Sequence, residues 1–203
     1  MRYQDPVFSD LGVALDRLQD EYGVTFVVAA ENYRVLPFRG WPPEDLGEAD
    51  RVCAPADSVR ALVVGSVAHR DHASSRVKAG EPSPFSRRGP GPLYLPKPEL
   101  SHLGGNCNSL GESSQIGILS LDGQGNVAED VGTSYATPLV STLVANVNHR
   151  LLGDESRLLG RALLVHRRRF AGARSTRNSC ATRASARRPT LMRFSAANHG
   201  SRP

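Results

Sequence analysis

Gly132-Thr133-Ser134-Tyr135-Ala136-Thr137-Pro138 leads directly into Leu139-Val140-Ser141-Thr142-Leu143-Val144-Ala145-Asn146-Val147. From Ser134 onward the spacing of apolar residues predicts a helix that is apolar on nearly every side. A helix of that kind is normally buried, so we expect it to pack inside the core of a domain. The apolar positions are Ala136, Leu139, Val140, Leu143, Val144 and Val147.

Ser134 stands at the start of this helix, which is a favourable place for a nucleophile. A helix N-terminus presents unpaired backbone N–H groups and the positive end of the helix dipole, which stabilise the negative charge that develops in acyl transfer. Gly132 allows a substrate backbone to come close, and the small side chains of Ala136 and Thr137 permit tight packing beneath. The alternative is that Ser134 is only a helix cap, the commoner role of a serine at a helix start.

Three apolar runs upstream of this motif predict β-strands. Thr25–Ala30 and Ala61–Val67 are apolar almost throughout rather than alternating, which is typical of strands covered on both faces of a parallel sheet. Ile116–Leu121 is a third run, followed by a polar turn that contains glycine. Strands and helices that alternate in this way predict the α/β fold class.

Helices and loops account for most of the remaining chain. Ser9 can cap a helix that Gly23 ends, just before the first apolar run, and its apolar residues recur at helical spacing: Leu11, Ala14, Leu15 and Leu18. Leu158–Val165 predicts a last helix. The segment His69–Gly105 is rich in Gly, Pro, Ser and basic residues, so we expect long surface loops there.

The charge of the chain is divided unevenly. Residues 166–203 contain ten arginines and no Asp or Glu, and because the whole chain carries +5, residues 1–165 carry −5. The body is therefore mildly acidic, which argues against a nucleic-acid-binding domain. The Arg-rich tail has no apolar periodicity, and we expect it to be disordered or the product of a frameshift near residues 166–169.

The cysteines and the N-terminus indicate where the protein resides. Cys53, Cys107 and Cys180 have neither the spacing of a disulfide framework nor that of a zinc site. Met1–Pro6 has no apolar signal segment, and no run is long enough to cross a bilayer. We therefore predict a cytoplasmic location without membrane association, and neither a metal nor a cofactor.

Several landmarks in order resemble the subtilase family of serine proteases. Gly132-Thr133-Ser134-Tyr135-Ala136-Thr137-Pro138 is similar to the family's nucleophile motif, Gly-Thr-Ser-x-Ala-x-Pro. Phe26-Val27-Val28-Ala29-Ala30-Glu31-Asn32 is similar to the strand that ends in Ala-Ala-Gly-Asn. Between them, Pro55–Ser58, Ser83–Pro90 and Lys97–Leu100 follow in the order that the family shows.

This resemblance covers about Phe8 to Val165 and implies a fold and a mechanism. The fold would be a partial subtilisin-like three-layer α/β structure over residues 1–165, with a mostly parallel sheet flanked by helices and its front strands missing. Ser134 Oγ would attack the carbonyl of a peptide or protein substrate, with a histidine as base and an aspartate to orient it. Asn32 Nδ2 and the Ser134 N–H would bind the oxyanion.

The same resemblance implies that the base is absent from this chain. In the subtilisin order the aspartate and the histidine both precede the oxyanion asparagine, and only 31 residues precede Asn32. They could come from a separately encoded N-terminal half. All six histidines follow Asn32, and we interpret them as loop or surface residues: His69, His72, His102, His149, His166 and His199.

Glu31 stands where the family has a glycine that helps to form the wall of the substrate pocket. Together with Gly132 and Thr133, it is a candidate substrate-binding residue. A glutamate would narrow the pocket or, if it points inward, favour Arg or Lys substrates by charge pairing. If it points away, it could mark a protein that has lost activity.

Three functions therefore remain open. The first is a serine endopeptidase acting through an acyl-enzyme at Ser134, incomplete and inactive as this chain alone. The second is a non-catalytic remnant or binding module. The third and least favoured is nucleic-acid binding by the basic tail.

Overall fold

The computed structural model describes residues 8–44, 47–151 and 157–166. The chain divides into two compact units, Met1–Arg168 and Arg169–Pro203. Every described residue belongs to the first unit, so the predicted Arg-rich tail, residues 166–203, lies outside the described residues except for His166. The elements are α1 (Asp10–Tyr22), β1 (Val27–Ala29), η1 (Glu48–Asp50), β2 (Leu62–Val67), η2 (Pro92–Tyr94), β3 (Leu100–Leu103), β4 (Ile118–Leu121), β5 (Val127–Asp130) and α2 (Thr133–Arg150), and residues 157–166 are also helical.

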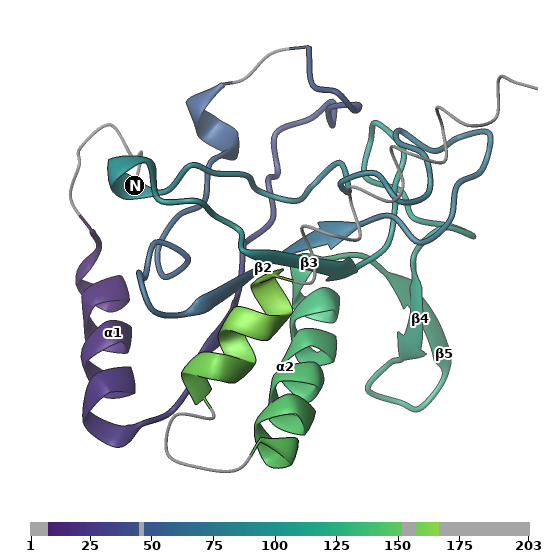
Figure 1. Cartoon of the computed structure of the whole chain (residues 1–203). Coiled ribbons are helices and arrows are strands. Elements are labelled where there is room, and N and C mark those ends of the chain that lie inside the picture. The colour runs from purple at the N-terminus through teal and green to yellow at the C-terminus, as the bar shows by residue number, and fades with distance from the viewer. Residues whose placement is uncertain (1–7, 45–46, 152–156, 167–203) are drawn as a thin grey trace, which may run out of the picture. The chain divides into compact units, whose positions relative to one another are not determined.

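A three-stranded parallel sheet in the order β1-β2-β3 lies at the centre (Figure 1). Val28 pairs with Val63, and Val64 pairs with Leu100. β2 is buried along almost its whole length, as the continuous apolar run predicts, whereas every residue of β1 is only half-buried. The α/β class and the parallel sheet flanked by helices are confirmed, and they match a partial subtilisin-like fold.

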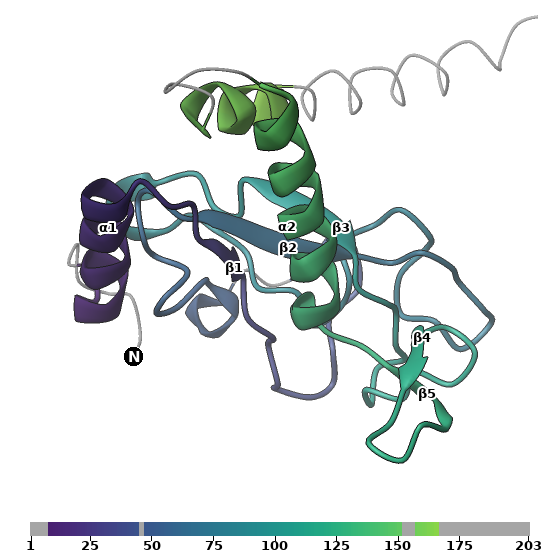
Figure 2. The same ribbon diagram turned by 90° about the horizontal axis from the view of Figure 1, so that it is seen from below.

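Each face of the sheet has its own apolar core. On one face, α2 crosses the three strands (Figure 2), and Leu62, Val64 and Leu100 pack against Ala136, Val140 and Val144. On the other face, Val63 packs with Ala30, Val52 and Ala56. The sheet is therefore covered on both faces, and within the described residues its two outer strands, β1 and β3, each pair only with β2.

The prediction that α2 is buried on nearly every side is wrong for one of its sides. Leu139 and Leu143 lie one turn apart, and each side chain is 45% exposed. The face with Ala136, Val140 and Val144 is buried because the sheet covers it. Within the described residues, the face with Leu139 and Leu143 is only partly covered, so the helix carries more apolar residues than this part of the chain buries.

Helix α1 begins and ends at the predicted residues but buries an unexpected face. Ser9 Oγ accepts the Gly12 N–H at 3.0 Å, and Gly23 ends the helix in the left-handed conformation. The buried residues of α1 are Gly12 and Gln19, while its leucines at 11 and 18 are largely exposed. The helix is therefore held by polar contacts rather than by an apolar stripe.

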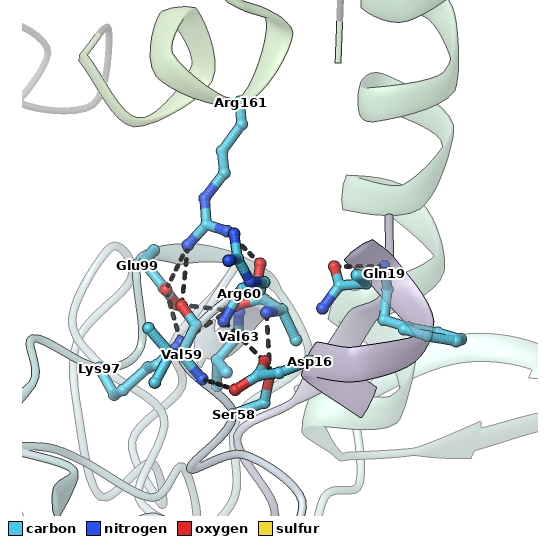
Figure 3. Close-up of polar contacts among 11 residues, drawn as sticks. Asp16, Gln19, Ser58, Val59, Arg60, Val63, Lys97, Glu99 and Arg161 are labelled. Atoms are coloured by element: carbon cyan, nitrogen blue, oxygen red, sulfur yellow. Dashed lines mark hydrogen bonds and ion pairs between the residues drawn. The ribbon is translucent and has the colours of Figure 1, made fainter. Parts of the chain in front are cut away.

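These polar contacts join α1 to the turn before β2 (Figure 3). Asp16 accepts hydrogen bonds from Ser58 Oγ and from the N–H groups of Val59 and Arg60. In return, the fully buried Asp57 accepts from Ser9 Oγ at 2.9 Å and from the Ser9 N–H. Asp16 of α1 thus accepts hydrogen bonds from donors in the turn before β2, and Asp57 of that turn accepts hydrogen bonds from Ser9, the residue that caps α1.

A second polar cluster attaches the helical residues 157–166 to the sheet (Figure 3). Glu99 accepts from Lys97 Nζ at 2.6 Å, from Arg161 at 3.2 Å and from the Val63 N–H at 2.9 Å. The Lys97 side chain is fully buried, and burial lowers its pKa although the neighbouring Glu99 opposes the change. Glu99 therefore forms ion pairs with two cationic side chains, Lys97 and Arg161, and also accepts a hydrogen bond from the backbone of β2.

The expectation of surface loops throughout His69–Gly105 is wrong in two places. Leu100–Leu103 forms β3, and the segment from Ser83 to Ser86 is buried. Serine hydroxyls form the contacts there: Ser66 Oγ and Ser83 Oγ are 2.7 Å apart, and Ser86 Oγ accepts the Ser66 N–H at 2.9 Å. In the sequence, a segment rich in serine looks like a surface loop. These serines are buried because they have hydrogen-bond partners distant along the chain, which the local sequence does not reveal.

The third predicted strand belongs to a separate hairpin. β4 pairs antiparallel with β5 through a turn in which Asp122 Oδ1 accepts the Asn126 N–H at 2.8 Å. None of the helices in the described ranges is long and apolar enough to cross a membrane.

Candidate active site

Ser134 lies in the first turn of α2 with its side chain exposed. The chain enters the helix through Gly132, whose N–H donates to the Gly104 carbonyl, 2.9 Å away and just beyond β3. Within the described residues, Ser134 Oγ makes no hydrogen bond. The hydroxyl is therefore accessible at a helix N-terminus, where the backbone N–H groups of the first turn have no partner inside the helix.

Asn32 lies beside this turn although it is distant in sequence. Its Oδ1 accepts two hydrogen bonds from Thr133, one from the backbone N–H and one from Oγ1, each 3.0 Å long. Because both donors meet the oxygen, the amide is oriented with Nδ2 away from Thr133. A Cβ added at Gly132 would be 3.2 Å from Asn32 Nδ2. Nδ2 thus faces the glycine, and in the described part of the chain it donates no hydrogen bond.

Short backbone pairing holds Asn32 in this position. The Tyr33 N–H donates to the Phe85 carbonyl at 2.6 Å, and the Arg87 N–H donates to the Glu31 carbonyl at 3.1 Å. Asn32 itself forms an antiparallel bridge with Ser86. The loop after β1 is therefore fixed on both sides of the asparagine.

Thr133, which was expected to contact substrate, is 1% exposed. Its hydroxyl donates to Asn32, and its carbonyl accepts from Thr137 Oγ1 at 2.8 Å. Its side chain is thus arranged to orient the Asn32 amide.

Glu31 has an exposed side chain and a left-handed backbone, with φ of 73°. That conformation suits glycine and strains other residues, which gives a physical reason for a glycine at this position. Burial raises the pKa of the nearby Cys53 thiol; Arg87 opposes this effect and Glu31 adds to it. The exposed carboxylate therefore lies near enough to Cys53 to affect the pKa of its thiol.

No histidine reaches Ser134 within the described residues. His72, His149 and His166 are exposed, and His199 is outside the described ranges. His69 lies in a loop, in agreement with the interpretation from the sequence, whereas His102 lies in β3, and both are half-buried. Burial lowers the pKa of His69; Arg70 adds to the decrease, while Glu129 opposes it. Its Nδ1 is buried without a hydrogen bond in the described structure.

Sequence reasoning missed an apolar pocket that begins at Asn32. Phe38, Phe85 and Leu110 are among the residues that line it. These three residues come from three separate loops, and although Phe85 lies in the Ser83–Pro90 landmark, no motif or periodicity marks Phe38 or Leu110. Only the folded chain brings them together.

Comparison with known proteins identifies the family. Residues 3–179 match the subtilase family of serine peptidases. An uncharacterized protein of Sinorhizobium fredii, y4bN, is 30% identical over 181 aligned residues, which cover 75% of this chain and 42% of that protein. The chain thus spans less than half the length of that relative. Since the family match extends over most of its residues, the chain belongs to the subtilase family.

Proposed function

We propose that this chain supplies the nucleophile and the oxyanion-binding groups of a serine endopeptidase. Ser134 Oγ attacks the peptide carbonyl, and the negative charge on the resulting oxyanion is stabilised by Asn32 Nδ2 and the Ser134 N–H. The observation that carries the proposal is the pair of hydrogen bonds from Thr133 to Asn32 Oδ1, which leaves Nδ2 available beside Gly132. A serine that only capped the helix would not need an oriented amide beside it.

The base in this proposal comes from outside these 203 residues. A serine hydroxyl is a weak nucleophile until a neighbouring base accepts its proton, and a histidine oriented by a carboxylate has that role in subtilases. The unpaired edge of β1 and the partly exposed Leu139 and Leu143 are two features against which a complementary polypeptide would pack. We therefore propose that this partner supplies the aspartate and the histidine, and that the chain alone does not hydrolyse peptides.

Complementation tests this function. The chain is co-expressed with a polypeptide that carries the aspartate and histidine segments of a subtilase, and hydrolysis of a casein substrate is measured on the co-purified complex. We expect activity that Ser134→Ala abolishes and that Asn32→Ala lowers by about 10²- to 10³-fold in kcat, a magnitude taken from subtilisin itself. A stable complex in which Asn32→Ala leaves kcat unchanged contradicts the proposed role of Asn32.

A non-catalytic binding module is the second candidate, and Glu31 favours it. A glutamate held at a φ of 73° is strained, and such a substitution is tolerated more easily where turnover is not required. This candidate predicts that a stable complex binds peptides but shows no hydrolysis. For either function we propose a cytoplasmic location, which is consistent with Cys53 and Cys107 as free thiols.

A further inference from the structure

Asp50 is a buried carboxylate that joins two arginines from different segments of the chain. Its side chain is 5% exposed and forms ion pairs with Arg39 Nη1 and with Arg88 Nε, the latter 2.9 Å away. The Arg39 and Arg88 side chains are themselves only 15% and 23% exposed. Because burial removes most of the water that would solvate these charges, both guanidinium groups depend on this one carboxylate in the described part of the chain. Neither Arg39 nor Asp50 belongs to a landmark that resembles the subtilases.

Both arginines also hold the segment Phe85–Arg88. Arg39 Nη2 donates to the Ser86 carbonyl at 2.5 Å, so its guanidinium group connects that carbonyl to Asp50. Arg88 belongs to the segment, and its backbone N–H donates to the Asp50 carbonyl at 3.0 Å. Asp50 is therefore connected to the segment by a backbone hydrogen bond and by two charged side chains.

The same segment holds the loop that carries Asn32. Asn32 forms an antiparallel bridge with Ser86, and the Tyr33 N–H donates to the Phe85 carbonyl at 2.6 Å. Ser86 is itself only 5% exposed, and its carbonyl is the one that accepts from Arg39. A continuous series of contacts therefore leads from the buried carboxylate through Arg39 and Ser86 to Asn32.

We propose that Asp50 and Arg39 are positioning residues for the oxyanion-binding amide of Asn32. The inference rests on the proposed function, because the amide needs a fixed position only if it binds the oxyanion. Thr133 orients the amide, whereas Arg39 and Asp50 fix the backbone from which it projects. Neither of their side chains has a hydrogen bond to Asn32 or Ser134 in the described residues, so they act on turnover through Asn32 alone. A donor displaced by about 1 Å loses much of its effect on the transition state.

Hydrogen–deuterium exchange of the full chain tests the contacts without requiring turnover. Arg39→Met removes the donor to Ser86 and leaves Asp50 paired with Arg88, so no buried charge loses its last partner. The peptide that contains Tyr33 is followed by mass spectrometry. We expect it to exchange about fivefold faster in Arg39→Met, the order of effect of one lost hydrogen bond.

A second arginine provides the control for this exchange experiment. Arg60 pairs with Asp20 at 2.9 Å, and their side chains are 52% and 55% exposed. Arg60→Met should therefore leave exchange at Tyr33 unchanged. Unchanged exchange in Arg39→Met, or an equal increase in Arg60→Met, overturns the inference.

Kinetics of the complementation complex test whether these contacts act through Asn32. Arg39→Met should lower kcat about tenfold, less than removal of the Asn32 amide itself, and leave KM unchanged because the oxyanion forms only on the way to the transition state. In an Asn32→Ala background, Arg39→Met should change kcat by less than about twofold. Asp50→Asn, which keeps the shape of the side chain and removes its charge, should depend on Asn32 in the same way. Losses that multiply in the double variants would show a general structural role and overturn the inference.

The result is separable from the fate of the proposed function. If complementation yields no Ser134-dependent hydrolysis while Arg39→Met still accelerates exchange at Tyr33, the contacts that hold the Asn32 loop are supported and the peptidase is rejected. A complex whose hydrolysis requires Ser134, but in which Arg39→Met leaves kcat unchanged, supports the peptidase and rejects the positioning role.

Discussion

At the residue scale, the site depends on how one side chain orients another. Thr133, next to Ser134, is buried, and both its N–H and its hydroxyl donate to Asn32 Oδ1. The orientation of the Asn32 amide therefore depends on Thr133. The sequence predicts Ser134 and Asn32 as candidates because each lies in a recognisable motif. It does not predict the role of Thr133, because that role depends on a contact between residues 101 positions apart.

Glu31→Gly should stabilise the chain. Residue 31 has a φ of 73°, and relief of a left-handed strain of about 1–2 kcal/mol outweighs the extra backbone entropy of glycine, leaving a gain of about 0.5–1 kcal/mol. Urea denaturation followed by circular dichroism measures the change. The control is Glu21→Gly in α1, which should destabilise by about 1 kcal/mol because the helical backbone there gains nothing from glycine.

His69 should make the chain less stable in mild acid. Burial lowers its pKa below the ordinary value of 6.5, so between the two pKa values the unfolded chain binds more protons than the folded chain. Stability therefore rises with pH across that window and is lost as the pH falls through the folded pKa. Denaturation midpoints between pH about 5 and 7.5 test this.

The control variants for this pH effect are His69→Gln and His72→Gln. Glutamine has no titration in this range, so His69→Gln should flatten the pH dependence. His72 is exposed, so His72→Gln should leave the pH dependence of the free energy of unfolding unchanged. An identical slope in wild type and His69→Gln would show that other groups cause the effect.

At the element scale, the ends of α1 and the burial of β2 were predictable, whereas the buried face of α1 was not. Ser9 and Gly23 bound α1 as expected because capping is a local property of the chain. The buried face of α1 was unexpected, since Gln19 is 5% exposed and donates and accepts hydrogen bonds instead of forming an apolar stripe. β3 was missed because its short sequence, Leu100–Leu103, carries no strong apolar pattern.

Asp57→Asn should weaken the attachment of α1. Asp57 is fully buried and accepts hydrogen bonds from both the N–H and the hydroxyl of Ser9. Replacing one carboxylate oxygen by a donor leaves an N–H group without its acceptor, at a cost of about 1–3 kcal/mol. Unfolding in urea should show this loss. Asp71→Asn, at an exposed position, should change the free energy of unfolding by less than about 0.5 kcal/mol.

At the scale of the whole molecule, the described residues form a sheet that is covered on both faces, with β1 and β3 as its edge strands. The family resemblance predicted this parallel sheet flanked by helices. The exposed side of α2 was not predicted, because an apolar pattern indicates burial without saying which polypeptide provides it. Leu139 and Leu143, each 45% exposed, identify the surface that remains uncovered.

The isolated chain should therefore self-associate through this surface. Exposed apolar side chains beside an unpaired strand edge favour contacts between copies. Leu143→Lys should reduce the average mass measured by static light scattering at micromolar concentration. Leu119→Lys on the hairpin is the control and should have a smaller effect. A monomeric wild-type chain with a cooperative melt at high temperature would contradict this prediction.

Fluorophosphonate labelling followed by peptide mass mapping tests the role of Ser134 most directly. The probe reacts with a serine whose hydroxyl is activated by a base and whose oxyanion is stabilised. We expect label on Ser134 when the aspartate- and histidine-bearing polypeptide is present, and no label on the chain alone. Equal labelling of Ser134 in the isolated chain would contradict the claim that its base comes from elsewhere. Labelling of another serine in the complex would contradict Ser134 as the nucleophile.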